Sequence, residues 1–286
     1  MLLQKNTAGK LRNILFVLAM LVVLTIVLGP YMWMVSSSFK TNLEIQGMEP
    51  SWIPRTFTLD NYVKMNTLVP LWHYFKNSLI ISSGTMILTL LIGTLAAYSL
   101  SRFKFWGKTP YIMTLFSTQV LPGILFLIPY FVIFNWIFHT FEVRMTNTYH
   151  GLIITYTQFS LPFATLMIMN YLSSVPREID EQAMIDGCSR VGALFRVIIP
   201  LAKPGIAAAG IYSFWMGWNE ILFAQILTRR DIRPLAVGLL DFRQQTQSQW
   251  GSMMAACIVT TIPIIILFSL MSKQIVSELT SGATKG

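Results

Sequence analysis

The chain has 286 residues, of which 54% are hydrophobic and only 12% are charged. Soluble domains carry about 25% charged residues, so this composition excludes an ordinary soluble domain and predicts a membrane protein. The net charge of +9 is explained by lysine and arginine in loops beside a membrane rather than by nucleic-acid binding. The two cysteines, Cys188 and Cys257, support no disulfide framework.

The first predicted membrane helix lies near the N-terminus. Lys5, Lys10 and Arg12 precede an uncharged run over 13–39, which is longer than the ~20 residues that a bilayer needs. A cleaved signal peptide has an apolar core of only ~7–15 residues, so we expect a retained helix. The polar, proline-containing stretch over 40–76 then forms an extracytoplasmic segment.

The second and third predicted spans are joined by a basic, aromatic turn over 102–108, which is typical of the inner membrane interface. The second span covers 77–101. The third, over 109–139, is long for one straight helix, and Pro122 and Pro129 are predicted to break or kink it because each removes a backbone hydrogen bond. Such a kink either lines a pathway or packs against a neighbour.

Three further spans are predicted over 151–172, 205–228 and 251–272. The fifth contains Glu220, about 22 Å along the helix from its start, and therefore in the outer half of the bilayer. A charge at that depth is costly, so Glu220 is expected to form a polar wall of a pathway or a structural hydrogen bond with a partner. The loop over 229–250 is placed outside.

A charged island over 176–205 separates the fourth and fifth spans. Ser174 and Pro176 are predicted to start a short helix there, and Gly187 to end it. Ser189 is predicted to cap a second helix. Its apolar residues share one helical face and are Val191, Leu194, Phe195 and Ile198. Pro200 and Pro204 are predicted to stop that helix.

The island also carries a recognisable motif. Glu181-Gln182-Ala183, Asp186-Gly187, Ile199-Pro200 and Pro204 together resemble the cytoplasmic "EAA" loop of bacterial ABC importer permeases, with departures at Gln182, Val197 and Ile199. In that family the loop forms coupling helices that dock into a groove on the ATPase subunit. By this resemblance the coupling residues are Glu181, Ala183, Asp186, Gly187, Arg190, Phe195 and Pro200. From spacing alone, an ordinary helical hairpin between two spans is the alternative.

Other segments resemble carbohydrate-type permeases. Ala97-Tyr98-Ser99-Leu100-Ser101-Arg102 matches the segment before their inner loop, and the ending Leu279–Gly286 is similar to theirs. Trp218-Asn219-Glu220 resembles a Trp-Asn-(Asp/Glu) segment and implies that Asn219 and Glu220 line the translocation pathway. In maltose-type systems the last outer loop reaches the binding protein, which implies contacts from Gln244, Gln245, Gln247 and Gln249.

Motifs for catalysis are absent from the sequence. The three histidines are isolated, and no nucleophile elbow or P-loop is found. We therefore expect no enzyme activity and no cofactor in this chain, with ATP and Mg²⁺ held by partner ATPase subunits. A secondary transporter of a small polar solute is the alternative, although the sequence shows no clear internal repeat. A membrane-embedded enzyme is disfavoured by the missing catalytic residues.

The sequence thus predicts an all-α protein with six transmembrane helices and the type I ABC importer permease fold, resembling the smaller permease of maltose-type systems. The expected parts are 1–39 with the first helix, 40–76 outside, a core over 77–273 with its coupling loop, and a tail over 274–286. The implied partners are a second permease, two ATPase subunits, an extracytoplasmic solute-binding protein, a sugar and membrane lipid. Because lysine and arginine slightly favour the side of the N-terminus, both termini are placed in the cytoplasm of a bacterium, with the chain in its inner membrane.

Overall fold

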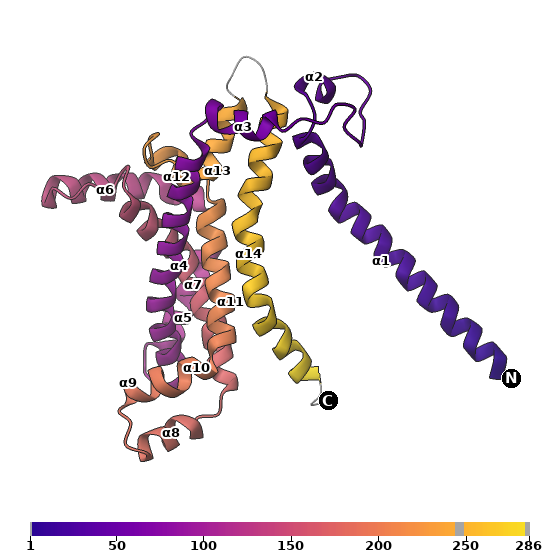
Figure 1. Cartoon of the computed structure of the whole chain (residues 1–286). Helices are drawn as coiled ribbons and strands as arrows, with labels where there is room; N and C mark the ends of the chain where they lie inside the picture. Colours follow the sequence, from indigo (N-terminus) through magenta and orange to yellow (C-terminus); the bar gives the residue numbers. More distant parts are fainter. Residues whose placement is uncertain (1, 244–248, 284–286) are drawn as a thin grey trace. The chain divides into compact units, whose positions relative to one another are not determined.

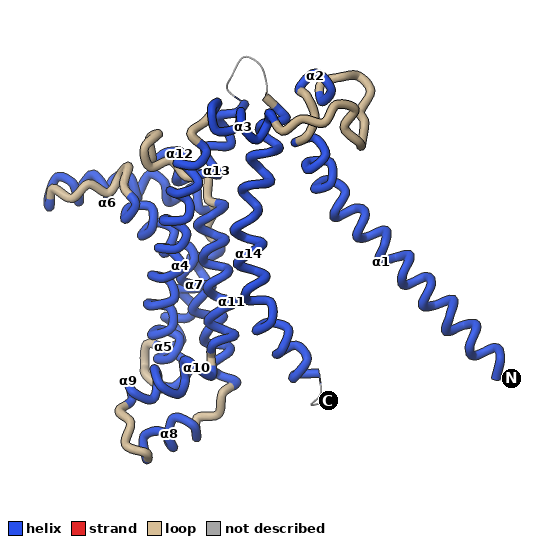
Figure 2. The backbone as a smooth tube through the Cα atoms, viewed as in Figure 1, coloured by secondary structure: helices blue, strands red, loops and turns tan. Residues whose placement is uncertain are grey.

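A computed structural model describes residues 2–243 and 249–283 (Figure 1). Helices joined by loops make up this described part, and no strand occurs in it (Figure 2). The all-α prediction is therefore confirmed. The chain forms two compact units, one of Met1–Pro70 with Leu239–Thr261 and the other of Leu71–Gly238 with Ile262–Gly286.

The first unit contains the N-terminal helix and the segment that follows it. Its elements are α1 (Leu2–Ser38), α2 (Asn42–Ile45), α3 (Asp60–Leu68), η3 (Leu239–Arg243) and the beginning of α14 (Trp250–Ala283). Most large apolar side chains of α1 between Ile14 and Val35 are exposed, as for example Phe16 at 65% and Ile26 at 70%. A helix that is apolar on all sides is suited to lipid or to another membrane protein.

A buried lysine organises the turn after α1. Lys40 is 1% exposed, its ammonium lies 4.3 Å from the ring centroid of Trp33, and it donates to the carbonyl of Ser51. Asn61 in α3 donates to the carbonyl of Lys40 at 2.7 Å. Gly251 lets α14 approach closely, because a Cβ there would lie 2.5 Å from the Asn61 side chain. The predicted extracytoplasmic segment is therefore folded around these contacts.

The second unit is built on three packed helices, α4 (Leu71–Arg102), α7 (Tyr149–Ser174) and α11 (Lys203–Asn219). Small and hydroxyl-bearing residues line their contacts, as in many membrane bundles. Thr89 and Ser160 share a buried hydrogen bond of 2.7 Å between α4 and α7. A Cβ on Gly217 of α11 would lie only 3.2 Å from the Ser82 Cα of α4, so glycine permits this close approach.

The third predicted span is broken once. It divides into α5 (Lys108–Val120), the 3₁₀ turn η1 (Gly123–Phe126) and α6 (Leu127–Phe141), and α6 turns away from the bundle (Figure 1). The break at Pro122 was predicted. A second break at Pro129 was predicted wrongly: Pro129 lies in the first turn of α6, where a missing N–H leaves no helical hydrogen bond unmade.

The predicted fifth span is not one continuous helix. α11 ends at Asn219, and a short helix, α12 (Leu222–Leu227), follows after a break, with α13 (Leu235–Gly238) beyond it. The described residues contain five helices long and apolar enough to cross a membrane. The bent pair Arg190–Leu201 and Lys203–Asn219, which meets at 80°, brings the number to six if it counts as one span.

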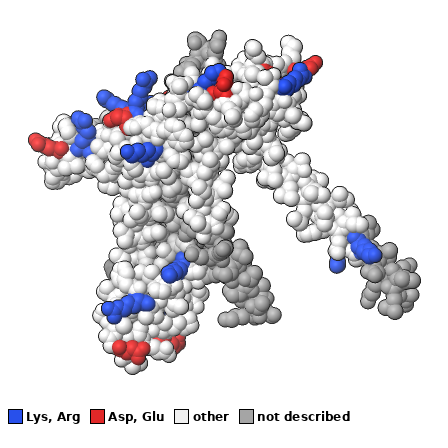
Figure 3. Space-filling model, in the orientation of Figure 1, with Lys and Arg blue, Asp and Glu red and all other residues white. Residues whose placement is uncertain are grey.

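The charged island folds into several short elements at one end of the second unit. They are α8 (Glu178–Ile185), α9 (Arg190–Ala193), the π turn η2 (Leu194–Ile198) and α10 (Ile199–Leu201). Figure 3 shows that the charged side chains on the visible face gather toward the ends of this unit, leaving the middle of the bundle largely uncharged. This distribution is expected of a bundle surrounded by lipid.

Candidate functional site

The first helix of the island ends as predicted, at a glycine. Gly187 has φ +89°, a conformation that side-chain-bearing residues rarely adopt. The Cys188 N–H bonds the Ala183 carbonyl at 3.0 Å, and the Gly187 N–H bonds the Met184 carbonyl at 3.1 Å. These two bonds close the helix end in the manner of a Schellman motif. The backbone conformation at position 187 therefore favours glycine.

The two predicted helix starts have different outcomes. Ser189 caps α9, because its hydroxyl accepts from the Gly192 N–H at 3.1 Å, which confirms the prediction. Ser174 does not cap α8. It is the last residue of α7 and donates to the Tyr171 carbonyl at 2.7 Å, while Arg177 occupies the cap position of α8 without a side-chain hydrogen bond.

Pro200 does not stop the second helix of the island, contrary to the prediction. The helical chain runs from Arg190 to Leu201 through the π turn η2, and it ends at Ala202, after which Lys203 begins α11 and Pro204 lies in its first turn. A π turn is wider than an α turn, so it can accommodate a proline ring that would otherwise clash with the preceding turn. The outcome is a bend of 80° between the island and α11.

The sequence-predicted coupling residues lie on α8, the turn after it, α9, η2 and α10, but they do not share one environment. Ala183 is buried at 6% exposure, and its side chain faces the interior of the unit. The others are exposed and comprise Glu181, Asp186, Gly187, Arg190, Phe195 and Pro200. Large apolar side chains lie exposed among them, namely Ile185 at 83%, Val191 at 65% and Phe195 at 56%. Exposed apolar groups bordered by charges are typical of a protein-binding surface.

A buried ion pair holds α8 against the end of α4. Arg102 Nε lies 2.7 Å from Asp180 Oδ2, and the two side chains are only 6% and 10% exposed. Tyr98 donates to the other carboxylate oxygen at 3.1 Å, and Arg102 also donates to the Val175 carbonyl at 2.9 Å. Sequence reasoning missed this pair, although both Tyr98 and Arg102 lie in the segment 97–102 that resembled other permeases.

Glu220 has a local structural role that explains the broken fifth span. Its carboxylate oxygens both lie 3.1 Å from the Phe223 N–H, and one accepts from the Ala224 N–H at 3.2 Å. A carboxylate that accepts from free N–H groups caps the start of a helix and complements its dipole. Asn219 is exposed, and its amide donates to the Trp215 carbonyl at 3.1 Å.

The two helix breaks meet at a cavity of about 230 Å³. Gly123 follows the first break, Glu220 forms the second, and the aromatic rings of Phe159 and Phe223 lie beside both. Tyr156, whose hydroxyl is buried, also lines this cavity. The Glu220 carboxylate therefore lies beside an aromatic and aliphatic cavity, to which it can offer hydrogen-bond acceptors.

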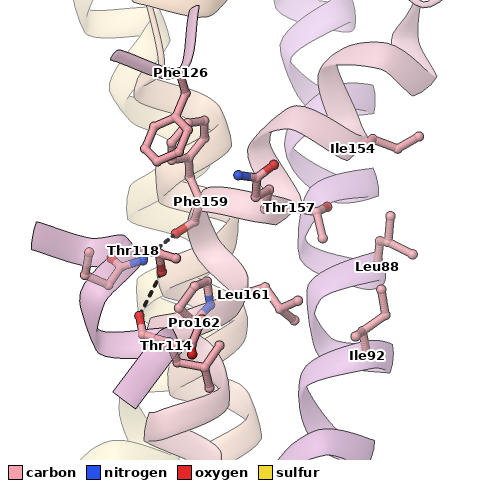
Figure 4. A pocket seen from close by; sticks show the side chains of 13 residues that line it. Leu88, Ile92, Thr114, Thr118, Phe126, Ile154, Thr157, Phe159, Leu161 and Pro162 are labelled. Atoms are coloured by element: carbon pink, nitrogen blue, oxygen red, sulfur yellow. Dashed lines mark hydrogen bonds between the residues drawn. The ribbon is translucent and has the colours of Figure 1, made fainter. Parts of the chain in front are cut away.

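A larger cavity, of about 450 Å³, lies between α4, α5 and α7 (Figure 4). In Figure 4, Leu88 of α4 and Thr118 of α5 lie on opposite sides of it, with Phe159 of α7 between them. The Gln119 amide donates to the Phe159 carbonyl at 3.5 Å. Pro162 also lines this cavity and removes one backbone donor from α7.

The loop over 229–250, which was predicted to lie outside and to touch a binding protein, is only partly described. Gln249 accepts a hydrogen bond from the Asn42 amide, and the Asn42 side-chain oxygen accepts from the Gly251 N–H at 3.1 Å. Gln244, Gln245 and Gln247 lie outside the described residues. Across the described part of the chain, no group of three or more His, Cys, Asp or Glu side chains could hold a metal ion.

Comparison with known proteins gives the family. Residues 89–280 match the family described as "Binding-protein-dependent transport system inner membrane component". The inner membrane ABC transporter permease protein YcjP of Escherichia coli is 35% identical, over 92% of this chain and 93% of the relative. The trehalose/maltose transport system permease protein MalG of Thermococcus litoralis is 33% identical, over 96% and 98%.

A solved structure supports the fold. A chain of a bacterial ABC transporter involved in alginate import matches with a TM-score of 0.77 at 19% identity, over 93% of this chain and 97% of the other. The predicted type I permease fold and the predicted resemblance to carbohydrate-type ABC importer permeases are confirmed. The chain belongs to the binding-protein-dependent transport system inner membrane component family, whose members are transport proteins rather than enzymes.

Proposed function

We propose that this chain is a permease subunit of an ATP-driven importer for a sugar or oligosaccharide, in which it forms half of the translocation pathway. Family membership and full-length relatives support the transport role. The sugar class rests on relatives named for trehalose/maltose, for sulfoquinovosyl glycerol and for diacetylchitobiose, each about a third identical over at least 90% of this chain. Family membership also favours this function over a secondary transporter.

The exposed face of the island is the observation that supports coupling to an ATPase. Ile185, Val191 and Phe195 expose apolar surface next to Glu181 and Arg190. The core of a protein interface is apolar and its rim is polar, which this arrangement provides. The sequence has no P-loop, so in this proposal a separate subunit binds ATP and Mg²⁺ and docks on this face.

The proposed assembly contains two ATPase subunits, a second permease and an extracytoplasmic binding protein. A structural relative has been solved as a bacterial alginate ABC transporter in complex with a pentasaccharide-bound periplasmic protein, and it supports a binding-protein partner. We place 176–205 and both termini in the cytoplasm, following the distribution of lysine and arginine. Gln244, Gln245, Gln247 and Gln249 then face the binding protein on the outer side.

The translocation pathway is assigned to the region of the two helix breaks. Irregular backbone at membrane depth is tolerated where it is buried in protein or lines a water-filled cavity. Glu220 supplies a carboxylate to the cavity at this point, and a carboxylate can accept hydrogen bonds from sugar hydroxyls. Asn219, next to it and exposed, supplies an amide that can both donate and accept. In this proposal the second permease forms the other side of the translocation pathway.

Reconstitution tests this function. Proteoliposomes should contain the chain with its partner permease and ATPases, with the binding protein outside and ATP inside. We expect uptake of radiolabelled sugar that requires ATP and the binding protein, and that continues when an uncoupler collapses the proton gradient. Uptake that follows the ion gradient without ATP would instead establish the secondary transporter.

A further inference from the structure

The buried ion pair between Arg102 and Asp180 differs from two exposed ion pairs of the described residues. The pairs Arg55–Glu49 and Lys64–Asp60 have side chains that are 58% to 83% exposed, whereas Arg102 and Asp180 are 6% and 10% exposed. Burying two charges costs so much desolvation energy that such a pair contributes little net stability compared with apolar residues of similar volume. We therefore expect this ion pair to have a role other than stabilising the folded subunit.

Its geometry fixes α8 to a membrane helix. Asp180 lies in the first turn of α8, and Tyr98 and Arg102 lie in the last turns of α4. Both carboxylate oxygens are engaged, one by Arg102 at 2.7 Å and the other by Tyr98 at 3.1 Å. Arg102 additionally holds the Val175 carbonyl at 2.9 Å, just before α8 begins. Two hydrogen bonds, from Tyr98 to Asp180 and from Arg102 to the Val175 carbonyl, therefore fix the position of α8, together with an ion pair between Arg102 and Asp180 that is short but lacks hydrogen-bond geometry.

A second set of contacts surrounds the first. Arg177, which precedes α8, donates to the Ser101 carbonyl of α4 at 3.1 Å. Arg190 at the start of α9 lies 5.3 Å from the ring centroid of Phe103, and that ring packs edge-on against Tyr98 with centroids 6.0 Å apart. The cytoplasmic end of α4 is therefore held by residues from before α8, within α8 and at the start of α9.

One side of α8 is buried against the rest of the unit, and the other side is exposed. Asp180 and Ala183 are buried toward the unit, whereas Glu181 and Ile185 are exposed. A partner that displaces α8 through its exposed side would thus act on α4 through the buried side. α4 in turn packs along α7 and α11, which reach the region of the helix breaks.

We propose that Asp180, Arg102 and Tyr98 are positioning residues that transmit displacement of α8 to α4, so that ATPase motion at the island becomes motion of the bundle. This inference rests on the proposed function, because it assumes that an ATPase docks on the island. Rigid, directional contacts carry displacement better than apolar packing, which allows sliding. The pair is accordingly expected to matter for coupling more than for assembly.

The experiment uses the complete importer in proteoliposomes and three variants: Asp180→Asn, Arg102→Gln and the double variant. Each single change leaves one buried charge unpaired and should lower the amount of assembled complex, whereas the double change removes both charges and should restore it. Sugar transported per ATP hydrolysed should still fall in the double variant, by about twofold to thirtyfold, the range over which residues on a coupling route act.

A nucleotide-dependent distance provides the second measurement. One spin label is placed on α8 and one on the outer half of α4, and the distance between them is measured with and without ATP. The ATP-dependent change in this distance should differ between the wild-type importer and the double variant, because in the double variant α8 should move without α4. Asp60→Asn, which removes the same charge from an exposed pair, serves as the matched control and should leave every quantity unchanged.

Two results would overturn the inference. Normal transport per ATP in a well-assembled double variant would show that the pair acts only in folding. If both single variants assemble and transport sugar as the wild type does, the ion pair contributes neither to assembly nor to coupling. Failure of the proposed function is recognised separately, because wild-type proteoliposomes would then show no ATP-driven sugar uptake.

Discussion

The rings of Phe159 in α7 and Phe223 in α12 lie with their centroids 4.9 Å apart, next to both helix breaks. A Cβ on Gly123, which follows the first break, would lie 3.9 Å from each ring. Phe223 is also the residue whose N–H is held by Glu220 at the second break. The two irregular segments therefore pack on a shared aromatic contact.

This aromatic contact predicts a measurable coupling energy. We expect Phe159→Leu and Phe223→Leu to destabilise the purified subunit, with an interaction term of about 0.5–1.5 kcal/mol in the double-mutant cycle, typical of aromatic pairs. Thermal unfolding of the detergent-solubilised protein measures it. Strict additivity of the two changes would mean that the rings do not support one another.

Two substitutions at Glu220 separate the effect of its capping hydrogen bonds from the effect of its charge. Glu220→Ala removes the acceptor for the Phe223 and Ala224 N–H groups and should cost about 1 kcal/mol of stability. Glu220→Gln keeps an acceptor oxygen and should cost less. If the carboxylate also contacts sugar in the pathway, Glu220→Gln will lower uptake while stability remains near wild type. Uptake that simply follows stability in both variants argues for a purely structural residue.

Gly187 is predicted to require glycine on conformational grounds. With φ +89°, any side chain at this position costs about 1–2 kcal/mol, although open space surrounds it. Gly187→Asp also adds a negative charge to the exposed island, so it should uncouple ATP hydrolysis from uptake while the subunit stays in the membrane. Gly107→Ala, at an ordinary φ of −85°, is the control. Normal uptake with normal ATPase stimulation in Gly187→Asp would refute this expectation.

The glutamine-rich loop over 244–249, which we propose lies outside, gives a prediction about the binding protein. Cysteines introduced at Gln245 or Gln247 should crosslink to the binding-protein cleft in the ATP-bound importer and less in the resting one. Replacing 244–248 with glycine and serine should reduce uptake, because the donors and acceptors are lost. If crosslinking is the same with and without ATP and uptake is unchanged by the replacement, the loop does not act on the binding protein.

Much of the island was predictable because its signals are local. Glycine at a helix end and serine at a helix start act within a few residues, so Gly187 and Ser189 were placed correctly. Pro200 was misplaced because its effect depends on the π turn before it, which the spacing of apolar residues does not reveal. The error over Ser174 arose because α7 extends to that residue.

Tertiary contacts account for what the sequence could not show. The pairing of Arg102 with Asp180 joins residues far apart in the chain, and no periodicity indicates it. The break after Asn219 has a local partner instead, since the Glu220 carboxylate accepts from the Phe223 and Ala224 N–H groups, a choice that the spacing of apolar residues does not reveal. The exposed faces of Ile185 and Val191 likewise became visible only once α8 and α9 were placed.

In the proposed importer an ATPase docks on the island, and a substitution at Ile185 probes that contact. Its side chain is 83% exposed and, in this account, is covered by the ATPase subunit. We predict that Ile185→Asp weakens binding of the purified ATPase to the permease in lipid nanodiscs by about tenfold or more, since a charge would be buried in an apolar contact, whereas Leu43→Asp, an equally exposed apolar site, has no effect. Equal ATPase affinity for wild-type and Ile185→Asp permease would contradict the account.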